Sequence, residues 1–188
     1  MPFQPGFRGK PLPPAVWQQS AAFAFSNNLT NVAPPANFRA LFPQSFLTIT
    51  GGSKVRLTLT AGVAFAGGEA ALQLDEVYFG QASASWSGTN PSFASTPQQV
   101  KFGGSGACTV ALGGTIVTDE IIMSLPVANG VLLSGWSNRS YTLRGVANAA
   151  ASFGVKAGAS ESSVVTVGAG WAQFTTAFVC CSKIEVFK

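Results

Sequence analysis

Few side chains in this sequence could do chemistry, and its acidic residues include two adjacent pairs, Asp75-Glu76 and Asp119-Glu120. Adjacent side chains on a β-strand point to opposite faces, so the carboxylates of a pair would diverge there. In a loop, either pair could instead ligate calcium together with backbone carbonyls. No third acid lies close in sequence to either pair. We therefore predict no metal site and no cofactor.

Nucleophilic catalysis lacks its usual base, because the sequence contains no histidine. This excludes Ser-His-Asp and Cys-His catalysis and most zinc sites. The seven acids include no pair typical of a glycosidase. The Gly-rich segments match neither the GxGxxG nor the GxxxxGK phosphate-binding pattern. We predict that the protein is not an enzyme.

The three cysteines, Cys108, Cys180 and Cys181, are too few for a disulfide framework. Cys108 falls in a predicted strand and is expected to point into the core. Adjacent cysteines rarely bond to each other because the bridge strains the peptide between them. On a strand they face opposite sides, so one of Cys180 and Cys181 is expected to be buried and the other to face outward. Free thiols are the main expectation, and an intermolecular disulfide or a bridge to Cys108 are the alternatives.

Aromatic side chains in polar segments provide a different kind of candidate site. Sugars stack on exposed aromatic rings that are flanked by amide and hydroxyl groups. The candidate stacking residues are Trp86, Trp136, Tyr141 and Trp171. The hydrogen-bonding groups near them in sequence are Asn90, Asn138 and Arg139. This interpretation requires the rings to be exposed.

Charge is scarce and is spread singly along the sequence. Charged residues make up 10% of the chain, well below the usual share, whereas hydrophobic residues make up 47%. So little charge leaves the surface to small polar side chains or to a covering protein, as in obligate assemblies. The eleven bases form no run, which argues against nucleic-acid binding. No apolar run reaches the roughly 18 residues of a membrane span, and we expect no signal peptide at the N-terminus.

Alternating apolar residues and turn signals predict an all-β fold. The stretch 100–134 is divided by Gly-Gly pairs, by proline and by Asn129-Gly130, which is typical of a β-sandwich or barrel. Residues 54–60 alternate cleanly, with Val55, Leu57 and Leu59 on one face. Strands are predicted at residues 46–50, 54–60, 71–79, 100–103, 108–112, 116–125, 131–133, 141–146, 164–167, 174–179 and 183–188. Loops are predicted at residues 80–97, 135–141 and 147–163.

The first 44 residues differ from the rest and are predicted to form an extended arm before a sandwich at residues 45–188. They hold eight of the eleven prolines and no acid. Proline removes backbone donors and favours extended conformations. Within this arm, residues 17–25 are either a strand or a helical turn, and 27–28 and 34–37 are loops. The residues expected to dock it on a neighbouring protein are Phe3, Phe7, Arg8 and Trp17; the alternative is that the arm folds back on its own domain.

Several segments from residue 55 onward carry a family pattern. They are VRLTLT (55–60), LQL (72–74), VKFGGS (100–105), LGGTIVTD (112–119) and FVCCSKIEV (178–186). Together they resemble the jelly-roll accessory domain that precedes the catalytic domain in some bacterial SGNH (GDSL-type) esterases. The resemblance spans about residues 45–188 and implies a jelly-roll-like antiparallel β-sandwich. It implies no catalytic residue here, because the sequence has neither the SGNH nucleophile block nor the histidine.

A jelly roll with an arm, sparse charge and no enzyme site looks like a bacteriophage virion protein, by analogy of architecture and composition. We therefore expect a capsid decoration, head-spike or tail-fibre module that docks on virion proteins through its arm. A homo-oligomer is expected, with a trimer as one form that it could take. The alternative function is a carbohydrate-binding module, either for host-surface glycans or as an esterase accessory domain. The expected location is the virion, with the bacterial cytoplasm or cell surface as alternatives.

Overall fold

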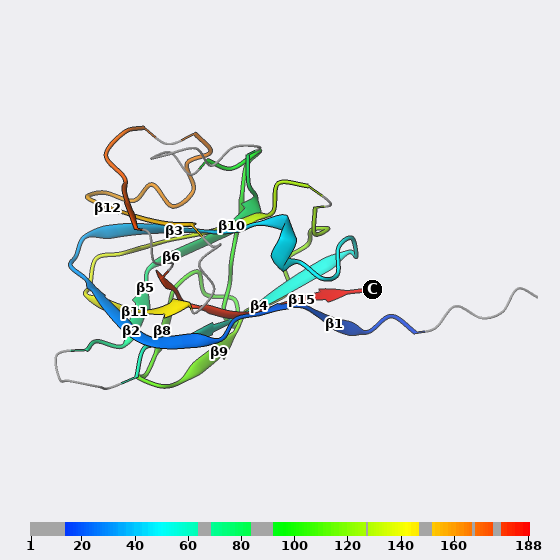
Figure 1. Cartoon of the computed structure of the whole chain (residues 1–188), viewed down its shortest axis with the longest axis horizontal. Coiled ribbons are helices and arrows are strands. Elements are labelled where there is room, and N and C mark those ends of the chain that lie inside the picture. The colour runs from blue at the N-terminus through cyan, green and yellow to red at the C-terminus, as the bar shows by residue number, and fades with distance from the viewer. Residues whose placement is uncertain are drawn as a thin grey trace, which may run out of the picture.

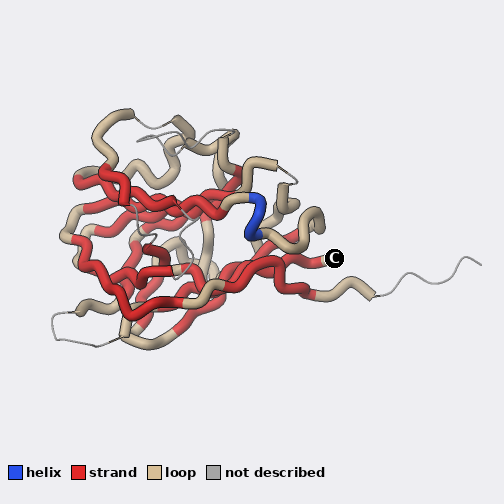
Figure 2. The backbone as a smooth tube through the Cα atoms, in the orientation of Figure 1, coloured by secondary structure: helices blue, strands red, loops and turns tan. Residues whose placement is uncertain are grey.

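The computed structural model describes residues 14–63, 69–83, 92–126, 128–146, 152–166, 168–174 and 178–188. Within these ranges the chain is built from β-strands, one short 3-10 helix (Gln44–Phe46) and loops (Figure 2). Every strand pairing in this part of the chain is antiparallel. The prediction of an all-β antiparallel fold, consistent with a β-sandwich, is confirmed. No helix in the described ranges is long and apolar enough to cross a membrane.

The described residues form four sheets, and Figure 1 shows the largest of them above the others. Its strand order is β13 (Ala172–Phe174), β12 (Ser152–Ala157), β3 (Ala36–Phe42), β10 (Val131–Ser137), β6 (Glu76–Gln81) and β7 (Gln98–Gln99). A four-stranded sheet has the order β1 (Trp17–Ala22), β15 (Cys181–Phe187), β4 (Lys54–Thr60) and β9 (Thr115–Val117). The smaller sheets are β14 (Phe178–Val179), β11 (Tyr141–Val146) and β2 (Phe25–Val32), and β5 (Leu72–Leu74) with β8 (Cys108–Val110).

The core is formed by the alternating apolar faces of these strands. On β4, Val55, Leu57 and Leu59 are all fully buried, as the alternation of residues 54–60 predicts. The segment 71–79 also behaves as predicted: its apolar residues are buried, and the strand is interrupted at Asp75. Large apolar side chains from the six-stranded and the four-stranded sheet meet in one buried cluster. Removing this apolar surface from water is the main term that favours the fold.

The turn before β10 is also confirmed. Asn129 and Gly130 both have positive φ, at 64° and 69°. This left-handed backbone suits a tight hairpin turn, and it favours Asn and Gly. A Cβ on Gly130 would collide with the carbonyl oxygen of Phe42. The turn therefore needs glycine for space as well as for backbone conformation.

The prediction of a separate arm over residues 1–44 is wrong from β1 onward. Residues 36–42 form β3, which lies between β10 and β12 inside the largest sheet. Residues 17–22 form β1, which pairs with the C-terminal strand β15. Residues 27–28, predicted as a loop, belong to β2; of the loop predicted at 34–37, residues 34–35 form a bend and 36–37 begin β3. The partners of these strands lie at least 89 residues away in sequence (Phe42 opposite Val131), so only the proline content was visible to local pattern analysis.

Other predicted elements differ where side chains or distant strands compete with local pattern. Residues 46–50 are not a strand, because Thr48 donates from both its backbone N–H and its hydroxyl to the carbonyl of Ser20 instead of joining a ladder. The strand predicted at 116–125 ends at Val117 and continues only as single bridges at Ile121 and Leu125.

The predicted loops at 135–141 and 147–163 each contain part of a strand. The first is occupied by the end of β10 and the start of β11, and the second by β12. Conversely, residues 164–166 form no strand, and 174–179 contains the end of β13 and all of β14. Small residues such as Gly, Ala and Ser hide strands from pattern analysis, since they give little apolar alternation.

Asp119 closes the turn of the VKFGGS segment. Its two carboxylate oxygens accept hydrogen bonds from the backbone N–H groups of Gly103 (2.9 Å) and Gly104 (2.7 Å). Both glycines have positive φ, which leaves their N–H groups pointing toward the carboxylate. The hydrogen bonds from Gly104 and then Gly103 lower the pKa of Asp119. Two segments that share the family pattern are thus joined by one side chain.

This contact predicts acid sensitivity. A carboxyl group whose pKa is lowered by folding stabilises the native state above its unfolded pKa of about 3.9, and this stabilisation is lost as the pH falls through the lower folded value. We expect the urea midpoint of the wild-type protein to fall between about pH 5 and pH 3, and Asp119→Asn to be less stable at pH 7 with a shallower fall. The matched control is Glu120→Gln, which removes the neighbouring charge. Identical pH profiles for Asp119→Asn and wild type would contradict this role.

Candidate functional site

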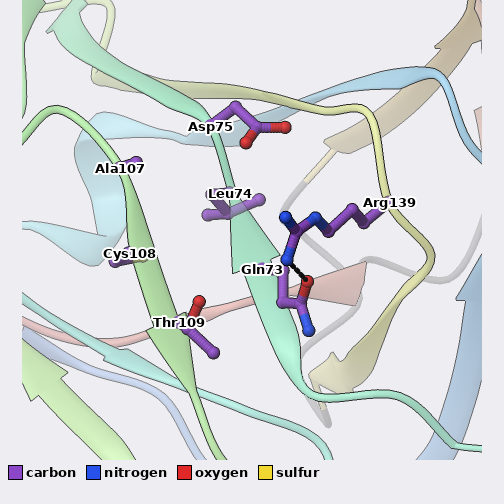
Figure 3. Close-up of a pocket in the computed structure, with 7 residues that line it drawn as sticks. All are labelled: Gln73, Leu74, Asp75, Ala107, Cys108, Thr109 and Arg139. Atoms are coloured by element: carbon purple, nitrogen blue, oxygen red, sulfur yellow. Dashed lines mark hydrogen bonds between the residues drawn. The ribbon is translucent and has the colours of Figure 1, made fainter.

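A pocket of about 260 Å³ lies beside the two-stranded sheet β5–β8. Its walls come from β5, from the chain around β8 and from the turn between β10 and β11 (Figure 3). The lining residues are Gln73, Leu74, Asp75, Ala107, Cys108, Thr109 and Arg139. Segments from three separate parts of the sequence therefore meet here.

The pairing of β5 with β8 decides which side chains reach the pocket. Gln73 lies opposite Thr109, and Leu74 lies opposite Cys108. Because strand side chains alternate, Leu74 and Cys108 point into the core while Gln73 and Thr109 face outward. The apolar pair thus anchors the sheet, and the polar pair forms one wall.

The turn after β10 is held over this wall by hydrogen bonds. The Asp75 Oδ2 atom accepts a bond of 2.7 Å from the backbone N–H of Asn138. Arg139 donates its backbone N–H to the hydroxyl of Ser137 and its Nη1 to the Oε1 of Gln73, at 3.2 Å. Figure 3 shows the guanidinium of Arg139 reaching over Gln73 below the carboxylate of Asp75. The turn thereby places the guanidinium of Arg139 close to the carboxylate of Asp75 and the amide of Gln73.

Neither charge in the pocket belongs to an ion pair. The salt bridges among the described residues are Lys54–Glu120, Arg56–Glu185, Lys156–Glu161 and Lys183–Glu185. The pocket therefore presents a carboxylate, a guanidinium, an amide and a hydroxyl without net charge. Burial raises the pKa of the Cys108 thiol to about 11, so the sulfur is protonated at neutral pH and is a poor nucleophile. These groups can bind a polar ligand by hydrogen bonds.

A second pocket, of about 200 Å³, lies by the end of β6. Its lining residues are Phe79, Gly80, Gln81, Ser95, Thr96, Gln98, Met123 and Ser124. It contains hydroxyl and amide groups but no charged side chain. The pocket at Arg139 is the stronger candidate, because charged groups make the strongest hydrogen bonds.

The predicted aromatic platform does not form as one exposed surface. Tyr141 is fully buried, and its ring lies 6.1 Å from that of Phe38. Trp171 is 4% exposed. Trp136 is half-buried and donates its ring N–H to the carbonyl of Gly158 at 3.0 Å. The prediction of exposed rings is wrong for Tyr141 and Trp171 because core packing covers both, and Trp86 lies outside the described residues.

Of the four residues predicted to dock the arm, the structure describes Trp17. Trp17 lies in β1, where its ring is 5.4 Å from the ring of Phe187 and 4.4 Å from the guanidinium carbon of Arg56. Arg56 also forms an ion pair with Glu185. Trp17 therefore packs on its own sheet. Phe3, Phe7 and Arg8 lie outside the described residues.

All three cysteines are buried and free. This confirms the prediction for Cys108. It contradicts the prediction that one of Cys180 and Cys181 faces outward; Cys180 sits at a bend between β14 and β15, and the pairing of β15 shifts register just after Cys181. Burial raises the pKa of Cys181 to about 12 and raises that of Cys180 as well. Such thiols are unreactive packing groups.

Sequence reasoning did not single out Arg39 as a buried residue. This arginine is fully buried on β3, between the rings of Phe93 and Trp171, at 4.7 and 5.4 Å from their centroids. Its Nη2 donates to the carbonyls of Glu161 and Val164. Arg39 thereby pins a loop over the outer face of the largest sheet. The feature of the sequence that could have indicated this burial is the position of Arg39 within the alternating apolar segment 36–42.

The wall residues Gln73, Asp75 and Thr109 were also not identified as ligand-binding groups from the sequence. Arg139 had been noted as a neighbour of the aromatic candidates, and Asp75 only as half of a pair that could ligate calcium. In the sequence, Gln73 and Thr109 are simply polar residues on the outward faces of two alternating strands. Only the pairing of β5 with β8 brings them together. Within the described residues, no cluster of three or more His, Cys, Asp or Glu side chains could hold a metal ion.

Comparison with known proteins gives no relative from which a function could be transferred. A scan of protein-family models and a search of the curated proteins both found no match to this chain.

Proposed function

We propose that this protein is a non-enzymatic structural component of a virion, which docks through its N-terminal segment and self-associates through its sandwich. The observation that carries the proposal is the place where that segment joins the fold. Val16 and Lys188 exchange backbone hydrogen bonds of 2.6 and 3.1 Å beside β1, an edge strand of the four-stranded sheet. The described chain therefore begins at a sheet edge beside the C-terminus (Figure 1), and the prolines and aromatics of residues 1–13 precede it in the sequence.

Exposed apolar side chains lie near both edges of this same sheet. Val16, just before β1, is 48% exposed, and Val117 on the opposite edge strand β9 is 49% exposed. Ile122, shortly after β9, is 63% exposed. Sheet edges in monomers are usually protected by charge or by proline, because they can pair with other chains. Apolar exposure at these edges supports association with copies of the chain or with other virion proteins.

The finer assignment is a capsid decoration protein, a head spike or a tail-fibre module with a jelly-roll topology. It rests on the resemblance to the esterase accessory domain and on the low charge of the chain. The contacts of Asp119 with Gly103 and Gly104 support that resemblance, since they join the VKFGGS and LGGTIVTD segments on which it rests. The proposed virion location rests on this analogy of architecture and composition.

Light scattering tests the assembly proposal. We expect the full-length protein to be a stable oligomer, and a chain that starts at residue 14 to keep this state, because the exposed apolar residues at the sheet edges, Val16, Val117 and Ile122, are all retained. Val117→Lys should shift the protein toward monomer, since it places a charge on the edge strand β9. The matched control is Val164→Lys, which changes an exposed valine outside the four-stranded sheet. A monomer for both chain lengths at high concentration would refute self-association.

Docking on a virion partner needs its own measurement. The full-length protein should bind partially assembled capsids or tails in a co-sedimentation experiment, and the chain that starts at residue 14 should not. Equal binding by both would show that residues 1–13 do not provide the attachment.

Glycan binding through stacked aromatic rings is the second candidate function. Of its four rings, the structure leaves Trp136 half-buried and covers Tyr141 and Trp171. Among the described candidates, sugar stacking therefore depends on the ring of Trp136. A hydrogen-bonding form has separate support in the pocket at Arg139.

A further inference from the structure

We propose that the pocket formed by β5, β8 and the β10–β11 turn binds a neutral saccharide unit. The inference does not depend on self-assembly, and it differs from the stacking site expected around the tryptophans. It rests on the charges, the free hydrogen-bonding groups and the size of the pocket.

The charges favour a neutral ligand. Asp75 and Arg139 are both exposed, and neither has an ion-pair partner among the described residues. A simple anion would meet the carboxylate of Asp75, and a simple cation would meet the guanidinium of Arg139. A sugar hydroxyl avoids both conflicts, because it donates to a carboxylate and accepts from a guanidinium.

The hydrogen-bonding groups still have capacity. Asp75 uses its Oδ2 to hold the N–H of Asn138, which fixes the carboxylate, while Oδ1 has no partner in the described part of the chain. The hydroxyl of Thr109 and the Nε2 of Gln73 likewise have no partner there. Among the described residues, the guanidinium of Arg139 donates through Nη1 alone, to Gln73. The pocket therefore offers both donors and acceptors to a ligand, as vicinal sugar hydroxyls require.

The lining also includes apolar residues. Ala107 is exposed there, whereas the side chains of Leu74 and Cys108 are buried in the core, and the polar groups come from the wall and from the turn. A pyranose has the matching character, with C–H groups on its faces and hydroxyls around its rim. The volume of about 260 Å³ lies just below the range of about 300–1,000 Å³ typical of drug-sized ligands. One sugar unit, such as the end of a glycan, is therefore the expected occupant.

Ligand-observed NMR on the full-length protein tests the proposal. The probes are the methyl glycosides of glucose, galactose and mannose, with methyl glucuronide as the anionic probe and glycine as the zwitterionic probe. We expect saturation transfer to at least one neutral glycoside. Arg139→Gln and Thr109→Val should each weaken that binding by about tenfold or more, since each removes hydrogen bonds to the ligand.

The control variant is Lys101→Gln, which removes one exposed positive charge that does not line the pocket and should leave the affinity unchanged. Thr109→Val keeps a β-branched residue on the strand, so it tests the site even if Arg139→Gln disturbs the turn. The proposal is overturned if no neutral glycoside binds, if only glucuronide or glycine binds, or if both pocket variants bind like wild type. Because these readouts are independent of oligomer size, they can fail while the assembly proposal holds, and the reverse is equally true.

Discussion

A chain that starts at residue 45 is expected to be unfolded. This deletion removes β1, β2 and β3, and each of them pairs with a strand from the C-terminal part of the sequence. The loss of β3 is the most damaging, since it would separate β10 from β12 in the middle of the largest sheet. Its apolar side chains Phe38, Ala40 and Phe42 are fully buried, so the remaining sheets would lose much of their shared core.

The free energy involved exceeds the margin of a typical domain. Deleting a single large core side chain costs about 3–5 kcal/mol, whereas a whole domain is stable by only about 5–15 kcal/mol. The deletion removes several such side chains at once. Circular dichroism during urea titration should show a cooperative transition for the full chain and for a chain that starts at residue 14, and none for a chain that starts at residue 45. A cooperative transition in the shortest chain would show that residues 14–44 are dispensable.

Replacement of Arg39 by methionine is expected to destabilise the protein by about 3 kcal/mol or more. Methionine would leave the carbonyls of Glu161 and Val164 without the donors that Arg39 now supplies. It would also remove the cation between the rings of Phe93 and Trp171. A buried polar group that loses its partner costs its full desolvation penalty, which makes this change larger than most surface substitutions.

The charge state of Arg39 supports this expectation. Burial lowers its pKa to about 10, while the nearby charge of Glu161 opposes the shift. The side chain therefore stays protonated at neutral pH, and its donors remain available to both carbonyls. The loop that it holds is fastened further by Asn37, which accepts a hydrogen bond from the N–H of Glu161 and donates one of 2.9 Å to the carbonyl of Ala159.

Urea unfolding followed by tryptophan fluorescence measures the effect. Arg39→Lys should fall between wild type and Arg39→Met, because lysine keeps a charge but not the planar fork of donors. The matched control is Arg139→Met, which changes an exposed arginine and should alter the free energy of unfolding by less than about 1 kcal/mol. If Arg39→Met unfolds at the wild-type urea concentration, the loop does not depend on this residue.

Prediction from sequence succeeded where the local pattern and the final environment agree. Residues 54–60 alternate in sequence and form β4 with one buried face. Asn129-Gly130 adopts the backbone conformation for which these residues are preferred. The all-β class and the buried Cys108 follow from the same kind of evidence. In these cases the residues within a few positions of each other carry the information.

Prediction failed where the environment of a residue is set by distant parts of the chain. Residues 36–42 look like the end of a proline-rich arm, yet β10 and β12 on either side make them a central strand. Tyr141 and Trp171 stand in polar segments, but packing buries both rings. Cys180 and Cys181 are both buried because a bend and a register shift override simple alternation.

The sequence alone therefore determined the fold class, the alternation of its clearest strands and the absence of histidine chemistry, since these depend on composition and on short-range pattern. The tertiary structure decided the extent of the folded unit, the burial of Arg39 and the pocket that joins Gln73, Thr109 and Arg139. The physical reason lies in strand pairing, because the hydrogen bonds of a β-sheet connect residues that are far apart in sequence, and no local pattern specifies which strands will meet.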